Sequence, residues 1–238
     1  MGISTSILRI TEYYARHGFG ATVRRAQLSL KRVMFANRMV VFYCDLSQSL
    51  PPIVTSTSLQ IDCAQSRAEI HPEYLEVLFN LWNPKLAERN LNKRFARSAS
   101  LWLIKYEGQL AGYCWTLCGG AIEPYYFPMG RTDVQLFDFY VIRKFRGGAI
   151  LRALIIHILH TVKAAGATRV FGDAAEWNQP SLCFYKMVPF RRLGVARSFT
   201  IFNHKFTTWY DGVKTPQLPT REKNTAELQR SQGASSEP

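Results

Sequence analysis

The sequence lacks any apolar run long enough to cross a membrane. A spanning helix needs roughly 18 to 20 consecutive apolar residues, and the longest candidate, residues 33–46, is interrupted by Asn37, Arg38 and Asp45. The amino-terminal residues also lack the continuous apolar segment of a secretory signal. We therefore expect a cytoplasmic protein.

Cysteine is scarce, and its spacing is not that of a metal site. The five cysteines are odd in number and show none of the paired short spacings of zinc ligands. Such cysteines favour a reducing compartment, where they pack as small apolar side chains. The sequence therefore predicts buried free thiols and no metal.

Acidic residues are few. There are 17 Asp plus Glu against 30 Lys plus Arg, which gives a net charge of +13. So basic a chain favours anionic partners: a CoA-type cofactor, a nucleotide sugar, an acidic lipid or a nucleic acid. Charge alone does not choose among them.

The basic character is strongest in residues 2–35, where Glu12 is the single acid. Apolar residues recur there at helical spacing, which predicts two short amphipathic helices. This arm could contact an anionic membrane, which would place the protein at the inner membrane face, or dock on its own domain, which is at least as favoured. Nucleic-acid binding ranks last, because the chain lacks the interleaved exposed aromatic residues of a stacking surface.

Composition divides the chain into four parts. We expect the arm plus a strand at 1–46, a linker at 47–58, one main domain at 59–213 and a disordered tail at 214–238, which has no apolar periodicity. Within the main domain the patterns predict a strand at 59–64, a helix from residue 72, a basic helix at 85–97, hairpin strands at 101–106 and 110–117, a long aromatic loop at 119–131 and closing strands at 191–195 and 199–206.

The centre of the domain is a strand, turn, helix and strand between residues 134 and 174. Aromatic and β-branched residues at 134–142 predict a buried strand, and apolar residues at helical spacing predict a helix at 150–165. A second strand at 167–174 and a short helix at 181–187 follow. The two strands of such a crossover unit should be parallel neighbours. The helix start, with several cations around it, should attract a phosphate or pyrophosphate.

These residues resemble a known family. The run from Val141 to Leu151, followed by Asn178, Ser181, Tyr185 and Phe190 at their intervals, is similar to the two acetyl-CoA motifs of the GNAT N-acetyltransferase superfamily. The resemblance implies an α/β (α+β) fold whose mixed, mostly antiparallel sheet is splayed at a parallel pair, and it implies acetyl-CoA, or another acyl-CoA, as co-substrate. It also implies that helix 85–97 borders the acceptor entrance, against the equal alternative of a solvated basic face. Long loops often serve function, so loop 119–131 is a candidate for acceptor specificity, against the alternative of a plain structural connector.

The resemblance also assigns cofactor contacts. The main chain of the strand before the turn would pair with the pantetheine arm, the loop would wrap the pyrophosphate, and the asparagine and tyrosine would lie beside the thioester. By position, these contacts are Phe139, Tyr140, Val141, Arg146, Gly147, Gly148, Ala149, Ile150, Leu151, Asn178 and Tyr185.

Four positions depart from the family's pattern: Arg143, Ala149, Leu151 and Pro189. Leu151 matters most, because it puts a large side chain where backbone and phosphate should meet. Either Gly147 and Gly148 compensate in a shifted turn, or cofactor affinity is reduced or lost.

Acyl transfer to an amine requires a proton donor for the departing thiolate and a base for the amine. Tyr185 is the candidate donor, against the alternative of a core aromatic residue. Asp138 and Glu176 are nearly equal candidates for the base, and for Asp138 an ion pair with an arginine is an equally favoured role. A backbone amide freed by a bulge or splay at 139–141 could hold the oxyanion.

The function predicted from these features is acyl-CoA-dependent N-acyl transfer, in the typical case N-acetylation. The acceptor would be an amine of an anionic small molecule, such as an amino sugar or a carrier-linked metabolite. The alternatives are a GNAT-fold binding or regulatory protein without acyl transfer, and a basic nucleic-acid-binding protein.

Overall fold

The structure is a computed structural model that describes residues 14–15, 18–24, 27, 38–53, 56–81, 83–123, 125–147, 149–201 and 204–211. The described positions of the basic arm are helical. Most of the arm, the tail at 214–238 and the predicted cofactor contact Gly148 lie outside the described residues. Within the described part, no helix is both long and apolar enough to cross a membrane.

The described chain alternates strands and helices in an order typical of a mixed α/β domain. The strands are β1 (Met39–Asp45), β2 (Leu59–Ala64), β3 (Ser100–Tyr106), β4 (Gln109–Cys118), β5 (Asp133–Val141), β6 (Arg169–Ala175), β7 (Arg191–Ile201) and β8 (His204–Trp209). The helices are α2 (Pro72–Asn80), α3 (Pro84–Phe95), α4 (Ala149–Ala164) and α5 (Gln179–Tyr185), with short 3-10 turns at Arg67–Glu69 and Arg143–Phe145.

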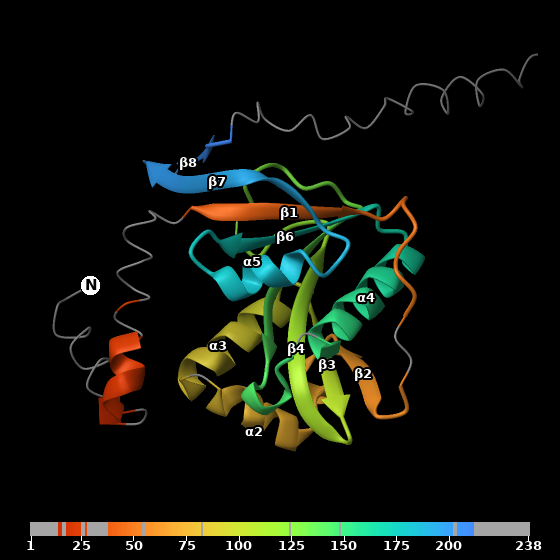
Figure 1. Cartoon of the computed structure of the whole chain (residues 1–238), viewed down its shortest axis with the longest axis vertical. Helices are drawn as coiled ribbons and strands as arrows, with labels where there is room; N and C mark the ends of the chain where they lie inside the picture. Colours follow the sequence, from red (N-terminus) through yellow and green to blue (C-terminus); the bar gives the residue numbers. More distant parts are fainter. Residues whose placement is uncertain are drawn as a thin grey trace, which may run out of the picture.

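The strands form one eight-stranded sheet in the order β2-β3-β4-β5-β6-β1-β7-β8. Every neighbouring pair is antiparallel except β5 and β6, which are parallel. Figure 1 shows the sheet with α4 and α5 in front of it. The predicted fold class is therefore confirmed: a mixed, mostly antiparallel sheet that contains one parallel pair.

β1 lies inside this sheet, although its sequence was grouped with the arm before the linker. All seven of its residues pair with β6, from Met39 opposite Ala175 to Asp45 opposite Arg169, and its other edge pairs with β7. Local pattern identified the strand, but its partners lie more than 120 residues further along the chain, and local pattern does not specify such distant pairing. The sheet of the domain therefore begins at β1.

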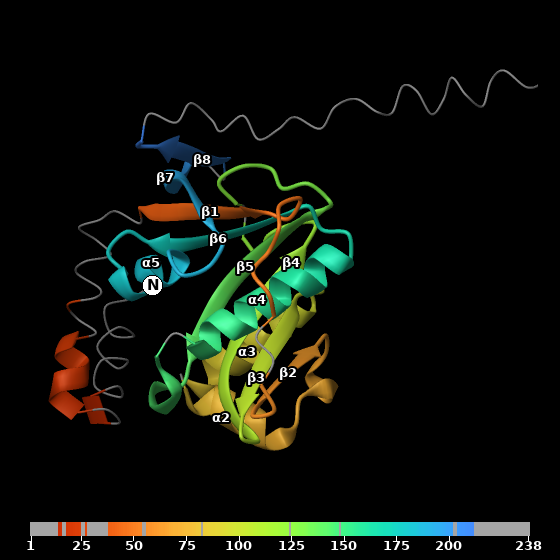
Figure 2. The same cartoon turned by 45° about the vertical axis from the view of Figure 1, so that its right-hand side comes forward.

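Helices cover the two faces of the sheet unequally. α4 and α5 pack on one face with the alternate residues of β1 and β3–β6, including Trp102, Leu136 and Val170. α2 and α3 pack on the other face against β3 and β4. Beyond α2 and α3, the loop at 119–131 covers β1, β6 and β7. Phe127 of the loop and Phe171 of β6 belong to the same buried cluster there. Figure 2 shows α4 lying across the sheet, with α2 and α3 behind it.

The closing hairpin differs from its prediction. The sequence suggested strands at 191–195 and 199–206, whereas β7 runs without interruption to Ile201 and β8 begins at His204. Phe199 and Phe206 therefore lie on opposite strands, paired in register with ring centroids 5.7 Å apart. The polar residues after Val195 were mistaken for a turn, although they continue the strand by pairing with β8.

Candidate active site

The parallel strands β5 and β6 separate along their length. They pair only from Asp133 opposite Arg169 to Gln135 opposite Phe171, yet β5 continues to Val141 and β6 to Ala175. At the closed end the fully buried Asp133 accepts two hydrogen bonds from the Arg169 guanidinium, at 2.8 and 2.9 Å. This ion pair fixes where the strands meet, and beyond it β5 and β6 no longer pair, in a region that we call the β5–β6 gap.

β5 carries a bulge beside this gap. Its pairing with β4 shifts from Phe137 opposite Trp115 to Tyr140 opposite Tyr113, so three steps on β5 match two on β4. Asp138 adopts a φ of +46°, a conformation that aspartate tolerates better than most residues. Gly112 is required opposite, because a Cβ there would lie 2.6 Å from the Tyr140 carbonyl oxygen. The predicted bulge or splay of this strand is therefore present.

The bulge turns Asp138 toward α3. Its carboxylate forms an ion pair with Arg94 at 2.5 Å and accepts a hydrogen bond from the Tyr113 hydroxyl at 3.4 Å. The Arg94 guanidinium also lies over the Trp115 and Phe137 rings. Two roles were weighed for Asp138, a catalytic base and a partner of an arginine. The structure contains the ion pair with an arginine.

Tyr185, from α5, fills the base of the β5–β6 gap. Its ring stacks on Phe42 at 4.1 Å and meets Phe139 and Phe190 edge-on at 5.9 and 5.3 Å. The side chain is 1% exposed. The hydroxyl lies against Gly172, the first residue of β6 beyond its pairing with β5, and a Cβ there would overlap it. The ring is thus part of the core, and the hydroxyl reaches the point where the strands separate.

That hydroxyl is buried and has no hydrogen-bond partner among the described residues. Burial, and then the nearby Asp173 and Cys114, raise the pKa of Tyr185 well above its usual value. An unpartnered buried hydroxyl costs about 1–3 kcal/mol, so native proteins keep few of them without a reason. The orphaned donor fits a ligand that brings an acceptor atom into the gap.

The turn after β5 holds the predicted phosphate contacts. Arg146 is exposed and donates to the Val141 carbonyl oxygen at 3.3 Å and the Tyr140 hydroxyl at 3.4 Å. Gly147 and Ala149 are exposed, and Ile150 is half-buried. Leu151 is 9% exposed and packs in the core under α4, so its large side chain points into the protein.

Asn178 and Glu176 lie where β6 leads into α5. Asn178 begins α5, and its side-chain amide donates to the Ser181 hydroxyl at 2.9 Å. Glu176 forms an ion pair with Arg38 at 3.0 Å. Glu176 and the Tyr185 ring also line a cavity of about 390 Å³ between β1, α5 and β7, whose apolar wall includes Phe42.

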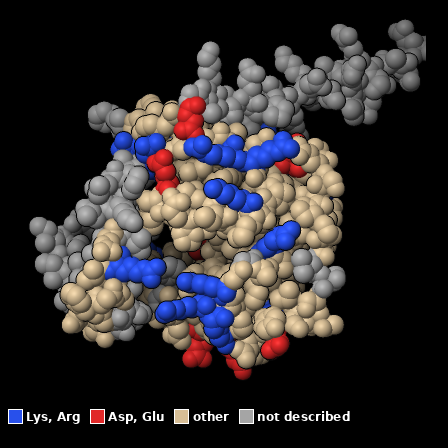
Figure 3. All heavy atoms as spheres, viewed as in Figure 1, with Lys and Arg blue, Asp and Glu red and all other residues tan. Residues whose placement is uncertain are grey.

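Two basic side chains, one near the end of α3 and one just beyond it, contact the loop at 119–131. Lys93 contacts Glu123 at 2.6 Å, and Arg97 donates to the carbonyl oxygens of Ala121 and Ile122. Figure 3 shows Lys and Arg side chains spread over this face of the molecule, including a row at the level of β7. The predicted basic rim of an acceptor entrance is thus partly committed to internal contacts.

The contact between Lys93 and Glu123 should contribute little to stability. Both side chains are at least half exposed, and exposed pairs contribute at most about 1 kcal/mol. Lys93→Ala should therefore lower the free energy of unfolding, measured by urea titration, by less than about 1 kcal/mol. A loss above about 2 kcal/mol would show that the pair anchors the loop.

Sequence reasoning missed three residues beside the gap. Tyr125 packs against Phe171 with a buried hydroxyl that has no partner among the described residues, and Asp173 accepts a hydrogen bond from Tyr126 at 3.4 Å. Gly172 lies between Phe171 and Asp173 on β6 and faces the Tyr185 hydroxyl. A glycine inside a strand marks a close approach, so Gly172 was the signal available in the sequence.

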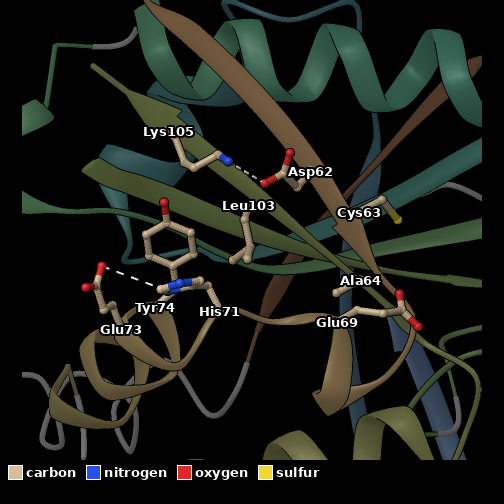
Figure 4. A pocket seen from close by; sticks show the side chains of 9 residues that line it. All are labelled: Asp62, Cys63, Ala64, Glu69, His71, Glu73, Tyr74, Leu103 and Lys105. Atoms are coloured by element: carbon tan, nitrogen blue, oxygen red, sulfur yellow. Dashed lines mark ion pairs between the residues drawn. The ribbon is translucent and has the colours of Figure 1, made fainter. Parts of the chain in front are cut away.

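A second cavity, of about 410 Å³, lies at the β2 edge of the sheet, three strands from the gap. Figure 4 shows Lys105 directed at Asp62, with which it forms a 2.7 Å ion pair, and Glu73 facing His71 at 3.9 Å. Glu69 accepts hydrogen bonds from Gln65 and Ser66. The carboxylates that line this second cavity already have partners. The cavity therefore gives no sign that it binds a ligand. No group of three or more potential ligands within the described ranges could hold a metal ion.

Comparison with known proteins agrees with this geometry. The family model described as the acetyltransferase (GNAT) family matches residues 67–188, more than half of the 238-residue chain. The chain therefore belongs to the GNAT acetyltransferase family. No curated protein matches it.

Several solved structures are similar to this chain at low sequence identity. The glucosamine N-acetyltransferase region of a fungal multi-domain GH3 β-N-acetylglucosaminidase is 13% identical with a TM-score of 0.50, over 77% of this chain and 22% of that one. A functionally unknown conserved protein from Staphylococcus epidermidis is 12% identical with a TM-score of 0.47, over 66% and 58%. A tandem GNAT protein from the clavulanic acid biosynthesis pathway is 16% identical with a TM-score of 0.47, over 73% and 52%. The chain thus spans less than two thirds of each of these proteins.

Proposed function

We propose that this protein is an acyl-CoA-dependent N-acyltransferase that moves an acetyl group from acetyl-CoA to an amine. The observation that carries the proposal is the Tyr185 hydroxyl, which is buried without a partner where β5 and β6 separate. Family membership supports acetyl transfer in general, and the choice of an amine acceptor belongs to the proposal.

The residues around the gap fit acetyl-CoA as co-substrate. At Phe139, Tyr140 and Val141, β5 pairs with β4 or lies in the bulge but does not pair with β6, so its edge toward β6 can pair with the pantetheine amides. The exposed Arg146 and Gly147, with Gly148, Ala149, Ile150 and the amide of Leu151 at the start of α4, would hold the pyrophosphate. Because the Leu151 side chain lies in the core, it leaves this loop open. Asn178 would lie beside the thioester.

Tyr185 would act as a proton donor to the departing sulfur. Its raised pKa keeps the phenol protonated through the physiological pH range, so it enters each turnover able to donate. For the base that activates the amine, Asp138 at the bulge and Glu176 at the end of β6 remain the candidates taken from the sequence. Each already contacts an arginine, Arg94 and Arg38 respectively.

The acceptor is proposed to be an anionic small molecule, for instance an amino sugar or a carrier-linked metabolite. The support is the net charge of +13, which raises the local concentration of anions. The membrane contact proposed for the arm depends on residues outside the described part, and the proposed cytoplasmic location rests on the sequence.

Two measurements test the proposal. Isothermal titration should detect acetyl-CoA binding, and thiol release should be observed with at least one member of a panel of primary amines that includes glucosamine and glucosamine 6-phosphate. Absence of binding at millimolar acetyl-CoA would reject the enzyme, and binding without transfer to any amine would favour a GNAT-fold binding protein.

Arg146→Ala should weaken acetyl-CoA binding about tenfold, the equivalent of roughly 1.4 kcal/mol, because it removes an exposed cation from the proposed pyrophosphate loop. The effect should shrink at high salt, as expected for a screened interaction. Arg131→Ala, which removes an exposed arginine from the loop at 119–131, is the matched control and should leave the Kd within twofold. If the two variants weakened acetyl-CoA binding equally, the assignment of the loop at Arg146 to the pyrophosphate would be contradicted.

A further inference from the structure

Arg94 lies in the last turn of α3 and reaches the bulge of β5 from the face of the sheet that α2 and α3 cover. Its guanidinium forms the 2.5 Å ion pair with Asp138, and it lies 5.0 Å from the centroid of the Trp115 ring and 5.4 Å from that of Phe137. The side chain is 19% exposed. Because a planar guanidinium can pair with a carboxylate and stack on aromatic rings at once, these contacts fix its direction.

The main chain of Arg94 is anchored as well. Its carbonyl oxygen accepts hydrogen bonds from the amide of Arg97 at 3.0 Å and from that of Ala99 at 3.1 Å. Ala99 is fully buried and directly precedes β3, the neighbour of β4 in the sheet. The ion pair at the bulge therefore starts from a helix end that is itself tied to the sheet.

The bulge changes which face of the sheet the residues of β5 occupy. Phe137 packs against the core under α2 and α3. In an unbroken strand neighbouring side chains alternate between faces, so Asp138 would point toward α4 and α5, and Phe139 toward α3. The structure has the opposite arrangement. Asp138 meets Arg94 of α3, and Phe139 packs against the core that contains Tyr185.

The hold on Asp138 and the orientation of the residues after it are therefore linked. A slip of one residue moves every following side chain to the other face of a strand. With Asp138 on the α3 side, the Phe139 ring lies 5.1 Å from that of Phe184 and 5.9 Å from that of Tyr185. The φ of +46° at Asp138 is a conformation that persists only where surrounding contacts maintain it, and the ion pair with Arg94 is such a contact.

We propose that Arg94 is a positioning residue for the transfer reaction, an inference that rests on the proposed function. By holding Asp138 toward α3, Arg94 maintains the bulge and sets the orientation of residues 139–141. Those residues present the edge of β5 to the pantetheine, and their alignment brings the thioester to the Tyr185 hydroxyl. Arg94 thus acts through β5, from the face of the sheet opposite to α5.

Two ligands separate this role from a general effect on folding. Acetyl-CoA contains the pantetheine that would pair with β5, whereas phospho-ADP, the nucleotide part of CoA, lacks it and would bind at the loop at 146–151. In isothermal titration Arg94→Ala should weaken acetyl-CoA binding about tenfold, the equivalent of roughly 1.4 kcal/mol, and leave the Kd of phospho-ADP within twofold. With the panel amine that wild type acetylates fastest, kcat should fall about 100-fold, because a misplacement of about 1 Å can cost that much.

Two further variants of α3 complete the comparison. Arg94→Lys keeps a cation at the bulge but lacks the planar group that stacks on the rings, so its acetyl-CoA affinity and kcat should lie between those of wild type and Arg94→Ala. It carries the test alone if Arg94→Ala does not fold. Arg89→Ala removes an exposed arginine from the same helix, and it should leave both values within twofold of wild type.

Three results would overturn the inference. The first is acetyl-CoA binding and kcat within twofold of wild type in Arg94→Ala. The second is an equal loss of acetyl-CoA and phospho-ADP binding, which would indicate general disruption. The third is a raised KM for the amine with unchanged acetyl-CoA binding, which would place Arg94 at the acceptor. If wild type itself binds no acetyl-CoA, the proposed function fails, whereas binding and transfer by wild type and Arg94→Ala alike remove only this inference.

Discussion

Replacing Tyr185 by phenylalanine should lower kcat by about 100- to 1000-fold while leaving the protein folded. The loss follows from removing a proton donor at the departing sulfur, a contribution of about 10²–10⁴-fold in positioned acid–base catalysis. The ring contacts with Phe42, Phe139 and Phe190 depend on the aromatic face and persist in the variant. The Kd for acetyl-CoA should change little, since the hydroxyl would act on the breaking bond.

The same substitution should raise stability. The wild-type hydroxyl is buried without a partner, and removing it relieves a cost of about 1–3 kcal/mol. We therefore expect the midpoint of thermal unfolding to rise by a few degrees, as for about 1 kcal/mol in a chain of this size. Tyr74→Phe is the control, because its hydroxyl donates to the Gly108 carbonyl oxygen far from the gap. Lower activity together with lower stability would mean that Tyr185 is only a core aromatic residue.

Gly172→Ala should be strongly disruptive for a change of a single methyl group. The added Cβ would overlap the Tyr185 hydroxyl and lie 3.1 Å from Cζ of the same ring. Because that ring is held by aromatic neighbours on several sides, it cannot move without disturbing the core. Overpacking of this kind costs about 1–3 kcal/mol, occasionally more. We expect a loss of about 3 kcal/mol in urea unfolding, with kcat reduced at least tenfold because the hydroxyl is displaced.

A double-mutant cycle tests the stated cause. Gly172→Ala combined with Tyr185→Phe removes the nearest clash, so the stability cost of the methyl group should be smaller than in wild type, and the two changes should not be additive. Gly120→Ala, where an added Cβ meets nothing within 4 Å, should be nearly neutral. Additive costs would show that the methyl group clashes with something other than the phenol.

Local elements of this fold could be predicted because their patterns are local. The β-branched and aromatic run forms β5, and the helical periodicity after it forms α4. Because α4 is the crossover between β5 and β6, these two strands were expected to be parallel, and they are. The place of β1 could not be predicted in this way. Its insertion between β6 and β7 depends on pairing with distant strands, and its apolar run would fit any central position of a sheet.

The candidate site was predictable only where a motif carried it. The motif identified Tyr185 and the loop at 146–151, but not that the Tyr185 ring would stack on Phe42 of β1 or that Leu151 would pack inward. Asp138 illustrates the limit. Its bulge turns the carboxylate toward Arg94. A bulge or splay and an arginine partner were expected, but strand alternation does not tell which arginine is the partner. Asp173 and Tyr126 come together only because the loop at 119–131 folds back over β6.

A crystal structure with bound acetyl-CoA tests the central claim most directly. The account predicts the pantetheine along the free edge of β5 and the sulfur within hydrogen-bonding distance of the Tyr185 hydroxyl, in the gap beyond the pairing of Gln135 with Phe171. Acetyl-CoA bound elsewhere, or a sulfur with no contact to that hydroxyl, would contradict it.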